Sequence, residues 1–160
     1  ISSFYFGHSF FDKQLLSRNF KISRGRTEIL LSEISVGNLV HKNEYLAVSI
    51  NIERSKLLGL FETTGFTEAY FIDDDGKLVG KTKVNSVLSV STSNLIDENN
   101  PLFIKESSNI SDAIIKVSNF VGESVPVTDN NGILKGVVTE SDLFLEYLKV
   151  QEQISEIEKD

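Results

Sequence analysis

The chain has 160 residues, of which 40% are apolar and 24% charged, and its formal net charge is −7. These values are typical of a soluble globular unit of one domain or two small ones, and the negative charge argues against nucleic acid as a partner. The chain has no cysteine, which excludes a disulfide framework, a thiol nucleophile and a thiolate metal site. It has only two histidines, so a histidine-rich metal site is poorly supplied.

The first predicted segment, residues 1–33, is a lead-in. Residues 1–28 hold five basic and two acidic side chains, a balance of +3 in an otherwise acidic chain. Such a segment is either solvated or lies beside anionic lipid on the cytoplasmic side of a membrane. The chain contains no methionine, even at its start, which indicates a fragment of a longer protein or a removed tag.

The rest of the chain contains a repeat. A shift of 56 positions aligns residues 46–88 with residues 102–144 without a gap, with shared apolar spacing and identities such as Asp73/Asp129, Gly76/Gly132 and Gly80/Gly136. We therefore predict two repeats joined by a polar linker and followed by a helical tail: 34–89, 90–101, 102–150 and 151–160.

Both repeats follow one order, strand-helix-strand-strand-helix. An extended piece is followed by polar residues suited to a helix cap and then by apolar residues at helical spacing. Turns of Asp or Asn followed by glycine, DDDG and DNNG, separate two apolar runs and predict a hairpin in each repeat. A second helix begins near Lys83 in repeat one and near Thr139 in repeat two. The predicted fold class is therefore α+β, with the two repeats packed as a pseudo-two-fold pair, since neither buries its sheet alone.

The stretch TESD, residues 139–142, supports two interpretations. Thr139 with an acid three residues later is a capping-box-like pattern at a helix start. The same geometry suits a nucleotide, because a helix N-terminus accepts a phosphate beside the Thr139 hydroxyl and Asp142 accepts hydrogen bonds from ribose hydroxyls. The DDDG turn lacks the ligand spacing of a calcium loop, and His8 and His41 are interpreted as solvated or simply packed.

The stretch VPVTDNNGILKGVVTESDLF resembles the C-terminal part of a CBS domain, and residues 34–150 resemble a tandem CBS pair, or Bateman module. Repeat one departs from the pattern, with Tyr70, Lys83 and Ser86 in place of Pro126, Thr139 and Asp142. The resemblance implies an adenine-nucleotide site at Thr139 and Asp142. We predict that its other wall comes from repeat one, at Tyr45, Phe66 and Thr67, where core packing is the alternative for both aromatic residues. At most one good site per chain is expected.

The lead-in HSFFDKQLLSRNFKISRGR, residues 8–26, resembles the segment that follows the last membrane helix of the chloride channel and chloride/proton antiporter (CLC) family. In that family a tandem CBS pair follows on the cytosolic side. The resemblance implies a cytosolic regulatory module of a chloride-transporting membrane protein that senses AMP, ADP or ATP, with no required cofactor. Its expected partners are the membrane transport domain of the same chain and a second copy in a homodimer.

Two other functions stay open. The pair is either a structural or dimerisation module without a ligand, or the regulatory CBS pair of another parent such as a soluble enzyme. The alternation of basic and apolar residues in the lead-in favours the membrane parent. Catalysis by this chain is not expected, because no constellation of acid, base and nucleophile is visible, and no metal site is predicted.

Overall fold

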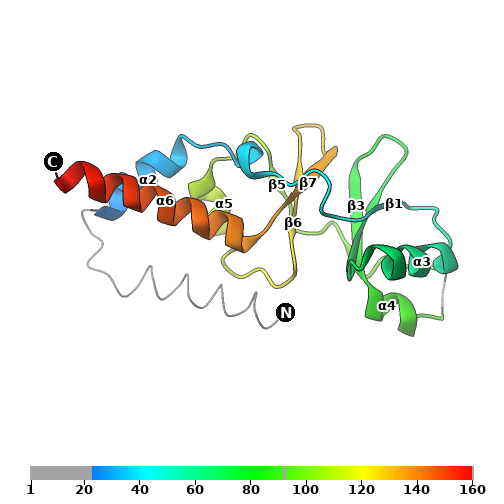
Figure 1. Cartoon of the computed structure of the whole chain (residues 1–160). Helices are drawn as coiled ribbons and strands as arrows, with labels where there is room; N and C mark the ends of the chain where they lie inside the picture. Colours follow the sequence, from blue (N-terminus) through cyan, green and yellow to red (C-terminus); the bar gives the residue numbers. More distant parts are fainter. Residues whose placement is uncertain (1–22, 92, 160) are drawn as a thin grey trace.

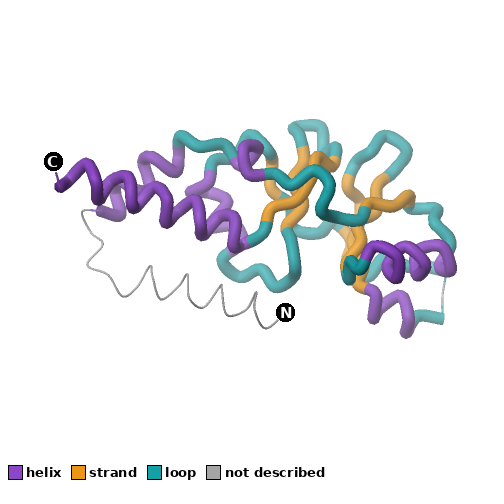
Figure 2. Tube along the Cα trace, viewed as in Figure 1, coloured by secondary structure: helices purple, strands orange, loops and turns teal. Residues whose placement is uncertain are grey.

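The structure is a computed structural model that describes residues 23–91 and 93–159. The predicted segment that resembles the region after a membrane helix lies largely outside these residues. The molecule is elongated: the strands of two sheets stand face to face in its middle, and the helices lie toward its two ends (Figures 1 and 2). None of the described helices is both long enough and apolar enough to cross a membrane.

Unit one contains the first repeat and a four-stranded sheet of order β1-β2-β3-β4, in which β1 and β2 are parallel and the other pairs antiparallel. Helices α3 and α4 belong to the same unit. The bounds are β1 Ala47–Ser49, α3 Arg54–Thr64, β2 Glu68–Ile72, β3 Leu78–Lys83, α4 Val84–Ser89 and β4 Glu98–Asn99. The short strand β4 and the buried Leu95 lie in the stretch predicted as a linker, so part of that stretch completes unit one.

Unit two contains the second repeat and a three-stranded sheet of order β5-β6-β7, with β5 and β6 parallel and β6 and β7 antiparallel. The bounds are β5 Ile104–Lys105, α5 Ile110–Val117, β6 Val125–Thr128, β7 Leu134–Val138 and α6 Glu140–Lys159. Both units therefore have the predicted order of strand, helix, strand, strand and helix, and the α+β prediction is confirmed.

The described segment ahead of β1 packs on unit two. Helix α2 (Ser23–Ser32) lies beside α5 and α6, and the short 3-10 helix η1 (Val36–Leu39) lies beside β5 (Figure 1). Leu31 and Val36 are buried in the same apolar cluster as Ile104 and Leu143. From Ser23 on, the described chain therefore runs along unit two, crosses to build unit one, and returns to unit two. The repeat boundaries drawn from the sequence remain a prediction.

Both hairpin turns are built the same way. Asp73 Oδ1 accepts the backbone N–H groups of Asp75 and Lys77 at 2.9 Å each, and Asp129 Oδ1 accepts the equivalent N–H groups in unit two at 2.8 and 3.0 Å. Gly76 and Gly132 have φ values of 83° and 86°, a conformation that glycine adopts without strain. The turn interpretation of DDDG is therefore confirmed.

The shift of 56 positions corresponds to a pseudo-two-fold relation between the units. Leu78 N–H donates to Gly132 O and Leu134 N–H donates to Gly76 O, each at 3.1 Å, so the two turns exchange equivalent hydrogen bonds. Thr67 also donates its hydroxyl to Glu123, which is 56 positions further along. Positions 56 apart can therefore be compared as equivalent places in the two units.

Gly80 and Gly136 occur in both repeats because a crossing segment passes close to each of them. A Cβ on Gly136 would lie 2.3 Å from Val40 Cγ1 and 2.5 Å from the carbonyl oxygen of His41. A Cβ on Gly80 would lie 2.8 Å from Ile96 Cγ2, and Ile96 is the equivalent of Val40. The absence of a side chain at these two positions favours this approach, most of all at Gly136, where backbone atoms come close. The approach brings residues 41 and 97 to the starts of helices α6 and α4.

Candidate functional site

Thr139 and Asp142 form a reciprocal cap at the start of α6. The Thr139 N–H donates to Asp142 Oδ2 at 2.8 Å, and the Asp142 N–H donates to Thr139 Oγ1 at 3.1 Å. Strand β7 ends at Val138 and α6 begins at Glu140, so the two residues occupy the turn between them. The capping interpretation of TESD is thus confirmed, and the cap fixes the Asp142 carboxylate beside the positive end of a 20-residue helix.

His41 is the partner of Asp142 from the crossing segment. Its Nε2 lies 3.0 Å from Asp142 Oδ2 and its Nδ1 lies 3.3 Å from Glu44 Oε2. Its backbone N–H and carbonyl exchange hydrogen bonds of 2.8 and 3.1 Å with Val137. The hydrogen bond that His41 donates to the Asp142 carboxylate raises the pKa of His41, against the opposing effect of burial. The interpretation of His41 as solvated or simply packed was therefore wrong.

The Asp142 carboxylate keeps capacity for a ligand. Both bonds described above use Oδ2, and among the contacts of the described residues Oδ1 has no donor. The side chain is 22% exposed, so solvent reaches it. An ionised carboxylate accepts hydroxyl groups strongly, and an adjacent helix N-terminus favours an anion. The site can therefore hold a molecule that carries hydroxyl groups next to a negative group.

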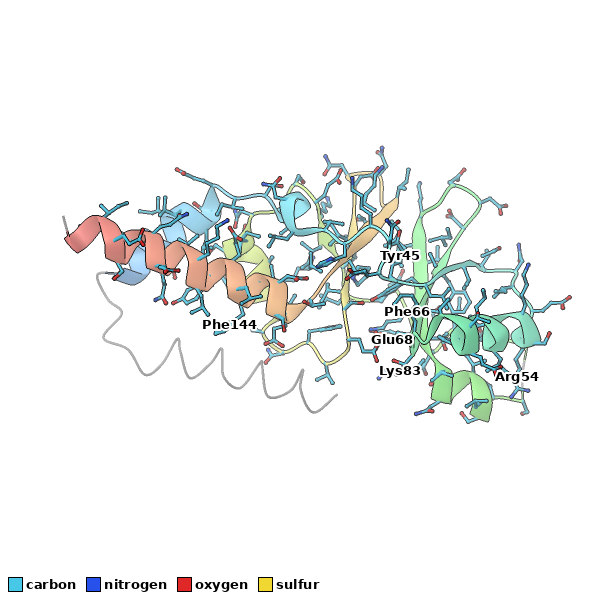
Figure 3. The ribbon with its side chains drawn as sticks, in the orientation of Figure 1. Tyr45, Arg54, Phe66, Glu68, Lys83 and Phe144 are labelled. Atoms are coloured by element: carbon cyan, nitrogen blue, oxygen red, sulfur yellow. The ribbon has the colours of Figure 1, made fainter. Side chains whose placement is uncertain are left out.

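The three predicted wall residues lie where unit one meets unit two, as Figure 3 shows for Tyr45 and Phe66. The half-buried Tyr45 ring makes an edge contact with Tyr70 at a centroid distance of 6.4 Å, and burial raises the pKa of Tyr45. Phe66 packs partly against the apolar core of unit one. Thr67 is exposed apart from its hydrogen bond to Glu123. Their role as a ligand wall remains a prediction.

At the equivalent place in unit one, the acid comes from the crossing segment and the hydroxyl comes from the helix. Asp97 is the equivalent of His41, and its N–H donates to Lys81 O at 3.0 Å, as His41 does to Val137. The Ser86 hydroxyl, at the position of Asp142, donates to Asp97 Oδ2 at 3.0 Å. Sequence comparison predicted no acid here, because residue 97 lies outside the gap-free alignment. Extending the shift of 56 beyond that alignment would have paired His41 with Asp97.

The described residues offer no site for a metal. Across residues 23–91 and 93–159, no group of three histidine, cysteine or acidic side chains is arranged to hold a metal ion. The polar groups gathered between the units are instead paired with one another, as the contacts of Thr67 with Glu123 and Tyr70 with Ser124 show. These contacts join the two units to each other.

Residues 93–149 match the family model described as the CBS domain. Solved structures extend this likeness across both units. CBSX2 of Arabidopsis thaliana, solved in complex with AMP, is 21% identical, with a TM-score of 0.61 over 74% of this chain and 98% of that one. The chain has the fold of a CBS domain pair. Its two units correspond to the two domains of the pair.

Other CBS pairs come from different parent proteins. The cytosolic domain of the Mg²⁺ channel MgtE, in complex with ATP, is 17% identical, with a TM-score of 0.61 over 74% of this chain and 50% of that one. The CBS pair of protein MJ0100, in complex with 5′-methylthioadenosine and S-adenosyl-L-methionine, is 21% identical, with a TM-score of 0.58 over 71% and 94%. No curated protein sequence matches this chain.

Proposed function

We propose that this CBS pair is a regulatory module that binds an adenine nucleotide in the cleft beside Asp142. The observation that carries the proposal is the fixed Asp142 carboxylate, with Oδ1 available, at the N-terminus of α6. Solved CBS pairs of the same fold whose ligands are AMP, ATP and methylthioadenosine support an adenosine-type ligand. The module itself has no catalytic role in this proposal.

Each part of the nucleotide has a proposed contact residue. The ribose hydroxyls donate to Asp142, and the first phosphate lies at the start of α6 beside the Thr139 hydroxyl. The base lies against the wall formed by Tyr45, Phe66 and Thr67. Because the exposed Lys135 is the cation nearest in sequence to the site, a short phosphate chain suits it better than a triphosphate.

The proposed parent is a chloride-transporting membrane protein. The likeness of residues 8–26 to the CLC family supports it, as does the basic balance of the lead-in. The chain is also similar to the solved cytosolic domain of the Mg²⁺ channel MgtE and to the soluble part of a magnesium transporter, which supports a transport protein as the parent. The module then lies on the cytoplasmic side, joined to its membrane domain through the lead-in and paired with a second copy.

Regulation in this proposal is by differential binding. A nucleotide changes transport only by the difference in its affinity for two arrangements of the module. His41 and Asp142 join the crossing segment to α6, and α2 lies beside α6, so occupancy of the cleft acts on the part of the chain nearest the lead-in.

A second candidate function is a structural module that binds no ligand. The observation that favours it is that Asp142 Oδ2 already has two hydrogen-bond partners in the chain, the Thr139 N–H and the His41 ring. In that case Thr139 and Asp142 serve only to begin α6, and the pair holds two chains together. The two functions differ in whether the chain binds a nucleotide at all.

The test is calorimetric titration with AMP, ADP and ATP, with GTP as the control ligand, on the wild type and on Asp142→Asn. The asparagine keeps an acceptor for the Thr139 N–H and removes the charge. We expect adenine-selective binding by the wild type and a loss of roughly 10- to 150-fold in the variant, from about 1.5–3 kcal/mol for a hydrogen bond to a charged group. Substitution of the exposed Glu152 by alanine is the matched control. No binding by the wild type at millimolar concentrations supports the structural module.

A further inference from the structure

Unit one contains a buried lysine where it faces unit two. The Lys81 side chain on β3 is 5% exposed, and its ammonium group lies 3.1 Å from Oε2 of Glu68, whose side chain is 7% exposed. The same ammonium group lies 5.0 Å from the centroid of the Phe120 ring of unit two and 5.8 Å from that of Tyr70. A carboxylate and two aromatic faces therefore hold one cation between the two units.

The pseudo-two-fold relation shows what this lysine replaces. Position 81 corresponds to Val137 and position 68 to Ser124, so unit two has neither member of the ion pair. Phe66, a predicted wall residue of the site beside Asp142, corresponds to Gly122 in unit two. A Cβ on Gly122 would lie 3.1 Å from Lys81 Nζ and 2.6 Å from Phe120 Cζ, so the lysine extends up to the opposite wall.

The two equivalent places therefore differ in the side chains of the strand and of the facing wall. Beside Asp142 there is a small side chain on the strand, Val137, and an aromatic side chain on the wall. Beside Ser86 the strand bears the long Lys81, and the wall is bare backbone at Gly122. The hydrogen bonds of Tyr70 Oη to Ser124 O and Oγ, at 3.0 and 2.7 Å, tie the units together next to the lysine.

We propose that Lys81, held by Glu68 and Phe120, fills the cleft of unit one and limits the pair to one nucleotide per chain. This inference rests on the proposed function, because it specifies which of two equivalent clefts is used. A nucleotide base that enters the first cleft must displace the ammonium group from a carboxylate and from aromatic faces, in a place where water does not replace those contacts. Lys81 is thus a residue that determines binding stoichiometry without touching the ligand.

The experiment compares two matched chains by calorimetric titration with AMP. The first carries K83T, S86D and D97H, which transfer the Thr139, Asp142 and His41 side chains to unit one and leave Lys81 in place. The second carries the same three substitutions with E68S and K81V, which replace the ion pair by the unit-two residues at those positions. We expect the second chain to bind one AMP more than the first, and the first to bind as many as the wild type.

The result that overturns the inference is a gained site in the K83T/S86D/D97H chain, or no gained site in a cooperatively folding chain with all five substitutions. If the wild type binds no AMP, the proposed function fails at the Asp142 cleft, but the difference between the two matched chains still decides whether Lys81 closes the first cleft.

A measurement on the wild type covers the case in which the fivefold variant does not fold. We expect acetic anhydride to modify the buried Lys81 much more slowly than the exposed Lys83, with or without saturating AMP. Faster modification of Lys81 on addition of AMP, or equal rates for the two lysines, shows that the lysine does not occupy the cleft stably and overturns the inference.

Discussion

Substitution of Gly136 by alanine tests whether the close crossing of residues 40–41 over β7 holds the site together. The new Cβ would lie 2.5 Å from the His41 carbonyl oxygen and 2.3 Å from Val40 Cγ1. The His41 backbone cannot retreat without stretching its two hydrogen bonds to Val137, which are 2.8 and 3.1 Å long. The substitution therefore adds an overpacking cost to a loss of backbone bonding.

The magnitude follows from these two costs. Overpacking of a core costs typically 1–3 kcal/mol, and each weakened hydrogen bond about 1 kcal/mol, so Gly136→Ala should lower the free energy of unfolding by roughly 2–4 kcal/mol. Gly80→Ala meets only the Ile96 side chain, at 2.8 Å, which can rotate. Its cost should be about 1 kcal/mol.

Gly59 provides the matched control within the same chain. It lies inside helix α3, and a Cβ there would meet nothing within 4 Å. Gly59→Ala should therefore stabilise the protein by roughly 0.5–1 kcal/mol, as alanine does in helices. Urea unfolding followed by circular dichroism measures all three variants. Equal effects of Gly136→Ala and Gly80→Ala would show that the crossing segment yields easily and refute the reasoning.

Three other predictions concern the charged groups between the units. Lys81→Met should lower the free energy of unfolding by about 3–5 kcal/mol because it leaves Glu68 buried and unpaired, whereas Lys81→Met with Glu68→Gln should cost much less; equal melting temperatures for the two variants would contradict this. Because the pKa of His41 is raised in the folded state, its contribution to stability is full below the unfolded pKa of about 6.5 and is lost as the pH rises through the folded pKa. The wild type should therefore lose more stability than His41→Asn between about pH 6 and pH 8, measured by thermal unfolding, and parallel curves would contradict the role of His41. Asp142→Ala should also abolish the excess pH dependence of the wild type, since it removes the first cause of the raised pKa.

The sequence predicted the parts of the fold that depend on local signals. The turns at Gly76 and Gly132 could be recognised because an Asp-rich tetrapeptide ending in glycine has few other conformations. The repeat itself predicted a pseudo-two-fold pair. The spacing of Thr139 and Asp142 also predicted a cap as one of two interpretations, because a cap depends on residues within one helical turn.

What the sequence did not predict depends on contacts between distant segments. The packing of α2 on unit two rather than unit one is decided by which apolar face remains uncovered after both repeats fold. His41 and Asp97 lie outside the gap-free alignment, and only the crossing over the two glycines brings them to α6 and α4. Lys81 looks like an exposed strand residue in the sequence, and it is buried only because unit two supplies Phe120 and the bare backbone of Gly122.

The central claim is that the cleft beside Asp142 holds an adenine nucleotide and that the equivalent cleft in unit one does not. A crystal structure of this chain grown with AMP tests it most directly. The account predicts one AMP per chain, with its ribose hydroxyls on Asp142 and its phosphate beside Thr139, and the Lys81–Glu68 ion pair intact. AMP in the cleft of unit one, or bound away from Asp142, would contradict the account.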